Sequence, residues 1–147
     1  LVLLMPVIMS SGGNSGSQAS TLIIQAMAMG EVTLRDWWMV MKREILSGLL
    51  LGVILGVLGF LRIGVEEVFK DTYGDAWYLY GAAIGSSLVG VVLWGSLVGA
   101  MLPFILRRFG ADPASSSAPF VSTIVDVTGL VIYFSFATYI LRDVLFN

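Results

Sequence analysis

The sequence predicts an all-helical integral membrane domain, with four transmembrane helices in a single domain covering residues 1–147. Hydrophobic residues make up 57% of the chain and charged residues only 12%, whereas soluble domains carry about 25% charged residues. Four apolar stretches are near or above the length of about 20 residues that a helix needs to cross a bilayer. They are apolar on all sides, which favours helices over the alternating strands of a barrel.

The four predicted spans cover residues 1–29, 45–63, 78–106 and 119–141. No basic segment precedes the first apolar run, so we do not interpret that run as a signal peptide. The chain begins with Leu rather than Met. We therefore expect it to be part of a longer protein.

The positive charges predict how the spans are oriented. Five of the eight Lys and Arg residues lie in the loops 31–44 and 107–118. By the positive-inside rule these loops face the cytoplasm, and the loop 64–77 and the C-terminus face outward. The start of the chain then also lies outside, so a protein with a cytosolic N-terminus would need one more span upstream. The expected location is the cytoplasmic membrane.

The segment before the second span has its own pattern. Trp37 and Trp38 lie among charged residues, and Thr33 and Asp36 have the spacing of a capping box. The pattern predicts an interfacial amphipathic helix over residues 33–44. Alternatively, the two indoles belong to an aromatic belt that anchors the loop.

The first span combines polar and small residues. At about 100° per residue, one narrow arc of a helix contains five of the polar residues, namely Ser10, Asn14, Ser17, Thr21 and Gln25. Gly13 lies beside this arc and Pro6 continues it. Lipid is a poor environment for such a stripe, which should face protein or water. A water-lined pore and interhelical packing through Gly12-xxx-Gly16 both remain open.

The second and third spans look like scaffold. Both contain glycines at four-residue spacing, a pattern that lets helix backbones approach closely. The glycines are Gly48, Gly52 and Gly56 in one span and Gly81, Gly85, Gly95 and Gly99 in the other.

The last span contains Asp126, the one ionisable side chain deep inside an apolar stretch. Ser122, Gly129 and Tyr133 share its helix face, and Thr123 lies alongside. Asp126 would lie about 10 Å into this helix. A carboxylate at membrane depth is costly and usually marks an ion or proton pathway. Asp126 is then an ionised ligand for a passing cation or, alternatively, a protonated residue bonded to a neighbouring helix.

The available ligands limit the ion. The chain has no Cys and no His, so a metal site must use oxygen ligands, which suit Mg²⁺, Ca²⁺ or Mn²⁺. If two copies meet on a twofold axis, two Asp126 side chains face one pathway and match one divalent charge. With Ser122 and neighbouring oxygens, they could bind a largely hydrated Mg²⁺ through its waters.

Other function classes are disfavoured. The net charge is −2 and no basic run suits nucleic acid. The chain shows no nucleophile–base pair, paired acid or cofactor loop, which argues against an enzyme.

Three segments resemble the signature of the MgtE family of magnesium channels, over essentially the whole chain and in the family's order. They are Pro6-x6-Gly13-Asn14-x-Gly16-x-Gln18-x2-Thr21, Gly99-Ala100-Met101-Leu102-Pro103 and Asp126-Val127-Thr128-Gly129-Leu130-x2-Tyr133-Phe134. The resemblance implies a homodimeric pore with five spans per subunit, of which this chain contains the second to the fifth. The second and fifth line the pore, and they correspond here to residues 1–29 and 119–141.

The resemblance also implies roles for particular residues. Asp126 would be the central magnesium ligand, and Asp112 would belong to a cytoplasmic-side ion site. The implied pore-facing positions are Pro6, Ser10, Gly13, Ser17, Thr21, Ala118 and Ser122. Two residues depart from the family pattern. Ala118 occupies a position where the family has Asn, and Ser17 occupies a position where Asn can occur.

The combined prediction is a Mg²⁺ channel domain that acts as a homodimer in membrane lipid. Asp126 and Ser122 bind the ion, and Asn14, Thr123 and Gly129 join the pore lining. One alternative is a secondary transporter that exchanges Mg²⁺ for Na⁺ or H⁺, and another is a non-transporting subunit of a membrane complex. The residues leave open whether Mn²⁺, Co²⁺ or Ca²⁺ also pass.

Overall fold

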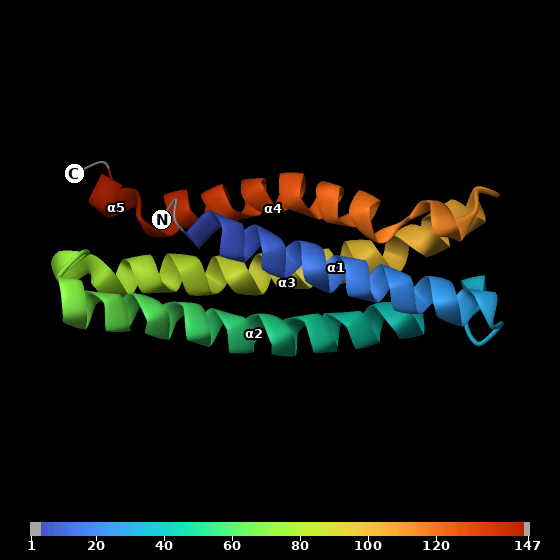
Figure 1. The fold of residues 1–147 in the computed structure, drawn as a ribbon, viewed down its shortest axis with the longest axis horizontal. Coiled ribbons are helices and arrows are strands. Elements are labelled where there is room, and N and C mark those ends of the chain that lie inside the picture. Colours follow the sequence, from blue (N-terminus) through green and yellow to red (C-terminus); the bar gives the residue numbers. More distant parts are fainter. Residues whose placement is uncertain (1–3, 146–147) are drawn as a thin grey trace.

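The computed structural model describes residues 4–145, and all regular structure in that range is helical (Figure 1). Four long helices run alternately in opposite directions: α1 (Met5–Ala28), α2 (Trp37–Lys70), α3 (Trp77–Arg108) and α4 (Ala118–Ile140). Single 3-10 turns lie in the connections, namely η2 (Leu34–Asp36), η3 (Gly74–Ala76) and η4 (Pro113–Ser115), and a short helix α5 (Arg142–Leu145) follows α4.

Within the described residues, three helices are long and apolar enough to cross a membrane: those that contain α2, α3 and α4. The fourth predicted span, at the start of the chain, corresponds to α1, and its residues 1–3 lie outside the described range. At 24 residues, α1 is about 36 Å long, sufficient for a bilayer core. Its Ser, Gly, Asn and Gln residues lower its hydropathy. By length α1 could therefore cross a membrane, but by composition it is less apolar than the other three helices.

The segment 33–44, predicted as an interfacial helix, is not set apart from the second span. Trp37 begins α2 directly, and this helix continues for 34 residues, beyond both ends of the predicted span. No Pro interrupts it, so the amphipathic segment extends into the membrane helix. The predicted capping is present: the Asp36 carboxylate accepts hydrogen bonds from the Thr33 N–H and hydroxyl, each at 2.8 Å.

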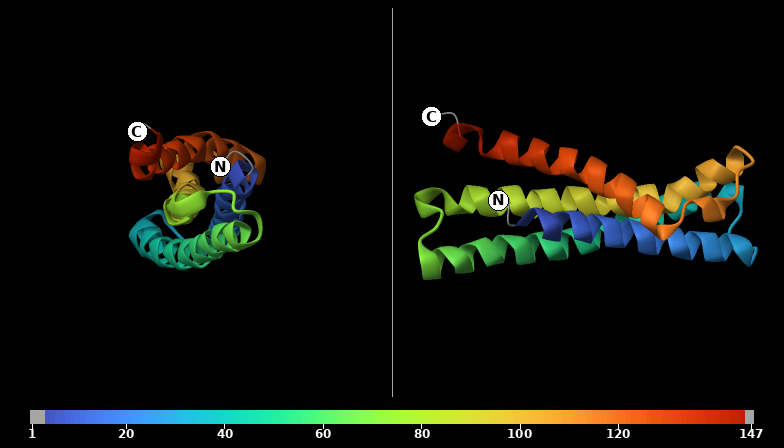
Figure 2. Two further views of the ribbon diagram at one scale, coloured as in Figure 1. Left: turned by 90° about the vertical axis from the view of Figure 1, so that its left-hand side faces the viewer. Right: turned by 45° about the horizontal axis from the view of Figure 1, so that its top comes forward.

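The central helix of the bundle is α3, which contacts α1, α2 and α4 (Figure 2). Its packing against α2 depends on the predicted glycines. A Cβ at Gly56 would lie 2.7 Å from the Gly85 carbonyl oxygen, and one at Gly52 would lie 3.0 Å from the Val89 Cα. These backbones therefore touch, as the small-residue spacing predicts.

The contact between α1 and α3 is closer still. Cβ atoms added at Gly95 and Gly99 would overlap the carbonyl oxygens of Gly12 and Gly16. Beside this contact, the buried hydroxyls of Ser15 and Ser96 form a hydrogen bond of 2.6 Å. The α1–α3 interface is thus a backbone-to-backbone contact with one polar link.

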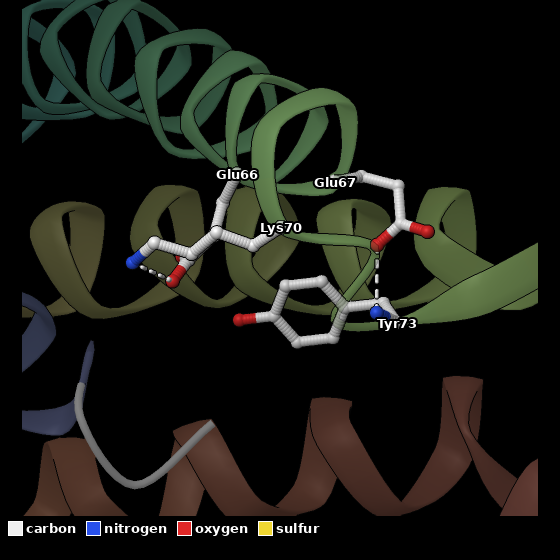
Figure 3. A network of polar contacts seen from close by, with 4 residues as sticks. All are labelled: Glu66, Glu67, Lys70 and Tyr73. Carbon is white, nitrogen blue, oxygen red and sulfur yellow. Dashed lines mark hydrogen bonds and ion pairs between the residues drawn. The ribbon is translucent and has the colours of Figure 1, made fainter.

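The turn between α2 and α3 contains a small polar network (Figure 3). Glu67 accepts a hydrogen bond of 2.6 Å from the Tyr73 N–H, and Lys70 lies 3.6 Å from Glu66. The pKa of the Tyr73 phenol is raised, mainly by burial and secondly by the negative charge of Glu66. The phenol therefore stays neutral at physiological pH. Asp71 ends α2 with a positive φ of 47°, which turns the chain back toward α3.

The connections between the helices lie at the two ends of the bundle. The α1–α2 and α3–α4 connections lie at one end, whereas the α2–α3 turn and α5 lie at the other (Figure 1). This is the grouping expected from the charge pattern. The side that faces the cytoplasm stays a prediction.

Candidate functional site

The candidate site lies between α1 and α4, which run antiparallel to each other and both pack against α3. Pro6 and Pro119 each lie in the first turn of their helix, where a missing N–H has no cost. The buried stripe of α4 packs into the bundle and consists of Val121, Val125, Gly129, Tyr133 and Ala137. Ser122 and Asp126 lie on one flank of this stripe, toward α1.

Gly13 is a point of close approach between the two polar helices. A Cβ at this position would lie 2.7 Å from the Ser122 Oγ and 2.9 Å from the Asp126 Oδ1. Any side chain here would displace one of these groups. The glycine therefore permits the carboxylate and the hydroxyl to lie directly against α1.

An open groove of about 570 Å³ runs along this junction. Its lining comprises Met5, Pro6, Met9, Ser10 and Asn14 of α1 with Ser122 and Asp126 of α4. The Asn14 amide donates a hydrogen bond of 3.2 Å to the Ser10 hydroxyl. The structure thus brings five predicted site residues together in one groove, with Gly13 beneath them.

The Asp126 carboxylate has an unusual hydrogen-bonding environment. Its Oδ1 atom is buried and has no hydrogen-bond partner among the described residues. Buried polar atoms are normally paired, and an orphaned one needs a specific explanation. In residues 4–145 no group of three or more Asp, Glu, His or Cys side chains could hold a metal. Among the residues that line the groove, Asp126 is the one carboxylate that a single copy of the chain contributes.

Hydrogen bonds join α1 to the start of α4. The Ser17 hydroxyl donates to the Ala118 carbonyl oxygen at 3.0 Å, and the Ser20 hydroxyl donates to the Ser116 carbonyl oxygen at 2.8 Å. Ser116 in turn donates to the Pro113 carbonyl oxygen at 2.7 Å. These bonds fix the start of α4 relative to α1.

Ser20 and Ser116 were not among the residues predicted for the site, and both are fully buried. A signal for Ser20 exists in the sequence. It follows Gly12 and Gly16 at four-residue spacing, which places it on the packing face of α1 rather than on the polar stripe.

Several predicted pore residues lie outside the groove lining. The hydroxyls of Thr21 and Thr123 donate to carbonyl oxygens of their own helices, at 2.8 and 2.9 Å, and both side chains are exposed. Gly129 is buried, and a Cβ there would lie 3.1 Å from Val91 of α3. It comes three residues after Asp126, which turns it by about 60° toward the core.

Asp112 lies in the exposed connection between α3 and α4 and does not line the groove. Its carboxylate accepts a hydrogen bond of 2.9 Å from the Ala114 N–H. In the described structure it caps the η4 turn.

Comparisons with known proteins point in one direction. The family model described as "MgtE: Divalent cation transporter" matches residues 5–136. The magnesium transporter MgtE of Thermus thermophilus is 46% identical over 144 residues, which is 98% of this chain and 30% of that protein. Proteins of the same name from Enterococcus faecalis and Bacillus subtilis are 26% and 29% identical over 97% and 94% of this chain. The chain spans about 30% of the length of these relatives. Their names describe transporters, in agreement with the prediction of a non-enzymatic protein.

Proposed function

Because the chain belongs to the MgtE family of divalent cation transporters, we propose that it forms the ion pathway of a Mg²⁺ channel in the cytoplasmic membrane. The observation that carries this proposal is the Asp126 carboxylate, which faces a polar groove and has a buried oxygen without a hydrogen-bond partner among the described residues. Because Asp126 lines the groove beside Ser10, Asn14 and Ser122, a cation in the groove, or its bound water, would lie next to this carboxylate.

The groove supports a homodimer. Ser10, Asn14, Ser122 and Asp126 place polar groups in a groove that is open along one side of the chain, and lipid is a poor neighbour for exposed polar groups. A second copy related by a twofold axis would cover it and bring a second Asp126 to the same axis. We propose that α1 and α4 of two subunits enclose the pathway and that each subunit has five spans.

The chemistry of the lining suits a hydrated ion. Two carboxylates match one divalent charge, and the Ser10, Asn14 and Ser122 side chains offer neutral oxygens. Mg²⁺ loses its waters reluctantly, so binding through retained waters requires no complete cage of protein ligands. In this proposal Asp126 supplies the charge and the neutral groups orient the hydration shell.

Transport by the full-length protein in liposomes tests the proposal. A membrane potential set by K⁺ and valinomycin, with no Na⁺ or pH gradient, should drive Mg²⁺ into vesicles that contain a magnesium-sensitive dye. An exchanger would require the Na⁺ or H⁺ gradient instead. A non-transporting subunit would show no uptake under either condition.

The close contact at Gly13 yields a second test. Gly13→Ala should reduce Mg²⁺ uptake by about tenfold, because overpacking of about 1–3 kcal/mol displaces the Asp126 and Ser122 side chains. Gly64→Ala is the matched control, since its Cβ would lie 3.3 Å from the nearest Trp77 ring carbon. Uptake by Gly13→Ala that equals uptake by Gly64→Ala would contradict this role of Gly13.

A further inference from the structure

Trp94 makes an isolated polar contact in the middle of a membrane helix. It lies near the centre of the 32-residue α3, and its side chain is 40% exposed. Its indole Nε1–H donates a hydrogen bond of 2.8 Å to the Thr128 hydroxyl. Thr128 in turn donates to the Ile124 carbonyl oxygen at 2.7 Å. Tryptophan is enriched at membrane interfaces, and an indole N–H in the apolar interior needs an acceptor.

The acceptor has a specific relation to Asp126. Thr128 follows Asp126 by two residues, so the two side chains point about 200° apart around α4. The buried stripe, with Val125 and Gly129, lies between them. Asp126 contacts Gly13 of α1 on one flank, and Thr128 binds Trp94 of α3 on the other. The two contacts therefore hold α4 on opposite flanks of its buried stripe.

Together the two contacts set the rotation of α4 about its own axis, and the position of Asp126 in the groove depends on this rotation. A rotation of α4 by about 20° would move a side-chain atom at the helix surface by about 2 Å. That displacement is enough to break the contact between Asp126 and Gly13. Gly90 extends the restraint along α3, because a Cβ there would lie 3.2 Å from Ile132.

We propose that Trp94 is a positioning residue: by binding Thr128 it sets the rotation of α4 that directs Asp126 into the groove. The importance of this rotation for transport rests on the proposed channel function. The rotation itself can be measured without transport.

Thiol accessibility measures the rotation. The chain has no cysteine, so a cysteine introduced at Ser122 or at Thr123 is the only thiol within it, and any cysteine elsewhere in the full-length protein is first replaced by serine. These positions differ by about 100° around α4, and any rotation changes the ratio of their reaction rates with a water-soluble thiol reagent. In the full-length protein, Trp94→Phe should change this ratio by about threefold, the factor that corresponds to a typical interhelical hydrogen bond in a membrane. Magnesium uptake should fall with it.

Thr128 provides the matched variants. Thr128→Ser keeps the hydroxyl and should retain the original ratio, whereas Thr128→Val should reproduce the effect of Trp94→Phe. The double variant should be no worse than either single one, because both remove the same bond. Thr128→Val preserves side-chain volume and serves if Trp94→Phe fails to fold.

The outcomes separate the two proposals. An unchanged accessibility ratio in folded Thr128→Val would overturn the positioning role, whatever the transport result. A changed ratio in a protein that passes no Mg²⁺, even in its unmodified form, would support the positioning role and overturn the channel function.

Discussion

Asp126→Asn is expected to reduce Mg²⁺ uptake by at least about thirtyfold, because loss of a buried charged partner costs about 2–5 kcal/mol. In the proposed homodimer the substitution removes both charges from the axis. Asn has nearly the same size as Asp, so the contact with Gly13 can persist. The measurement is dye-detected uptake by full-length protein in liposomes, at matched protein content.

Asp75→Asn is the control, since it makes the same chemical change on an exposed turn of η3. It should leave uptake unchanged. The thermal stability of Asp126→Asn should not fall, because the native carboxylate makes no ion pair in the described structure. Wild-type uptake by a folded Asp126→Asn protein would eliminate Asp126 as the ion ligand and the channel model with it.

Gly99→Val is expected to prevent folding. A Cβ on Gly99 would overlap the carbonyl oxygen of Gly16, and backbone cannot move aside as a flexible side chain can. Overpacking a close-packed interface with a single methyl group already costs about 1–3 kcal/mol, and Val adds three carbons. Size-exclusion profiles and thermal melts in detergent should show aggregated or unstable protein.

Gly64→Val tests whether this effect is local. Its Cβ would approach a Trp77 ring carbon at 3.3 Å rather than a carbonyl oxygen, so a much smaller loss of stability is expected. A normal melting profile for Gly99→Val would mean that α1 and α3 are not in backbone contact.

The scaffold was predictable because its causes are local. The Asp36 carboxylate accepts a hydrogen bond from the Thr33 N–H, as the capping-box spacing indicated. Gly52 and Gly56 allow α2 to lie against α3, as their four-residue spacing indicated. The amphipathic segment 33–44 is continuous with the second span for a physical reason. Amphipathic character describes which environment a segment prefers, whereas the end of a helix requires a breaker or a cap, and α2 has none between Trp37 and Lys70.

The site was predictable in part. Helical periodicity identified Ser10, Asn14, Ser122 and Asp126, which line one groove. The same periodicity grouped Gly129 with Asp126, although Gly129 packs against α3. A helical wheel gives the angle between two residues but does not indicate which of them a neighbouring helix covers.

The sequence by itself determined the helical membrane class, the polar stripe of α1, the deep carboxylate at Asp126 and membership of the MgtE family. These properties depend on hydropathy, helical period and residue identity, which belong to the chain alone. Only the tertiary structure decided that Gly13 lies against Asp126, that Ser20 binds Ser116 and that Trp94 binds Thr128. Such pairs depend on the rotation and register of one helix against another, which the packing of all four helices sets together.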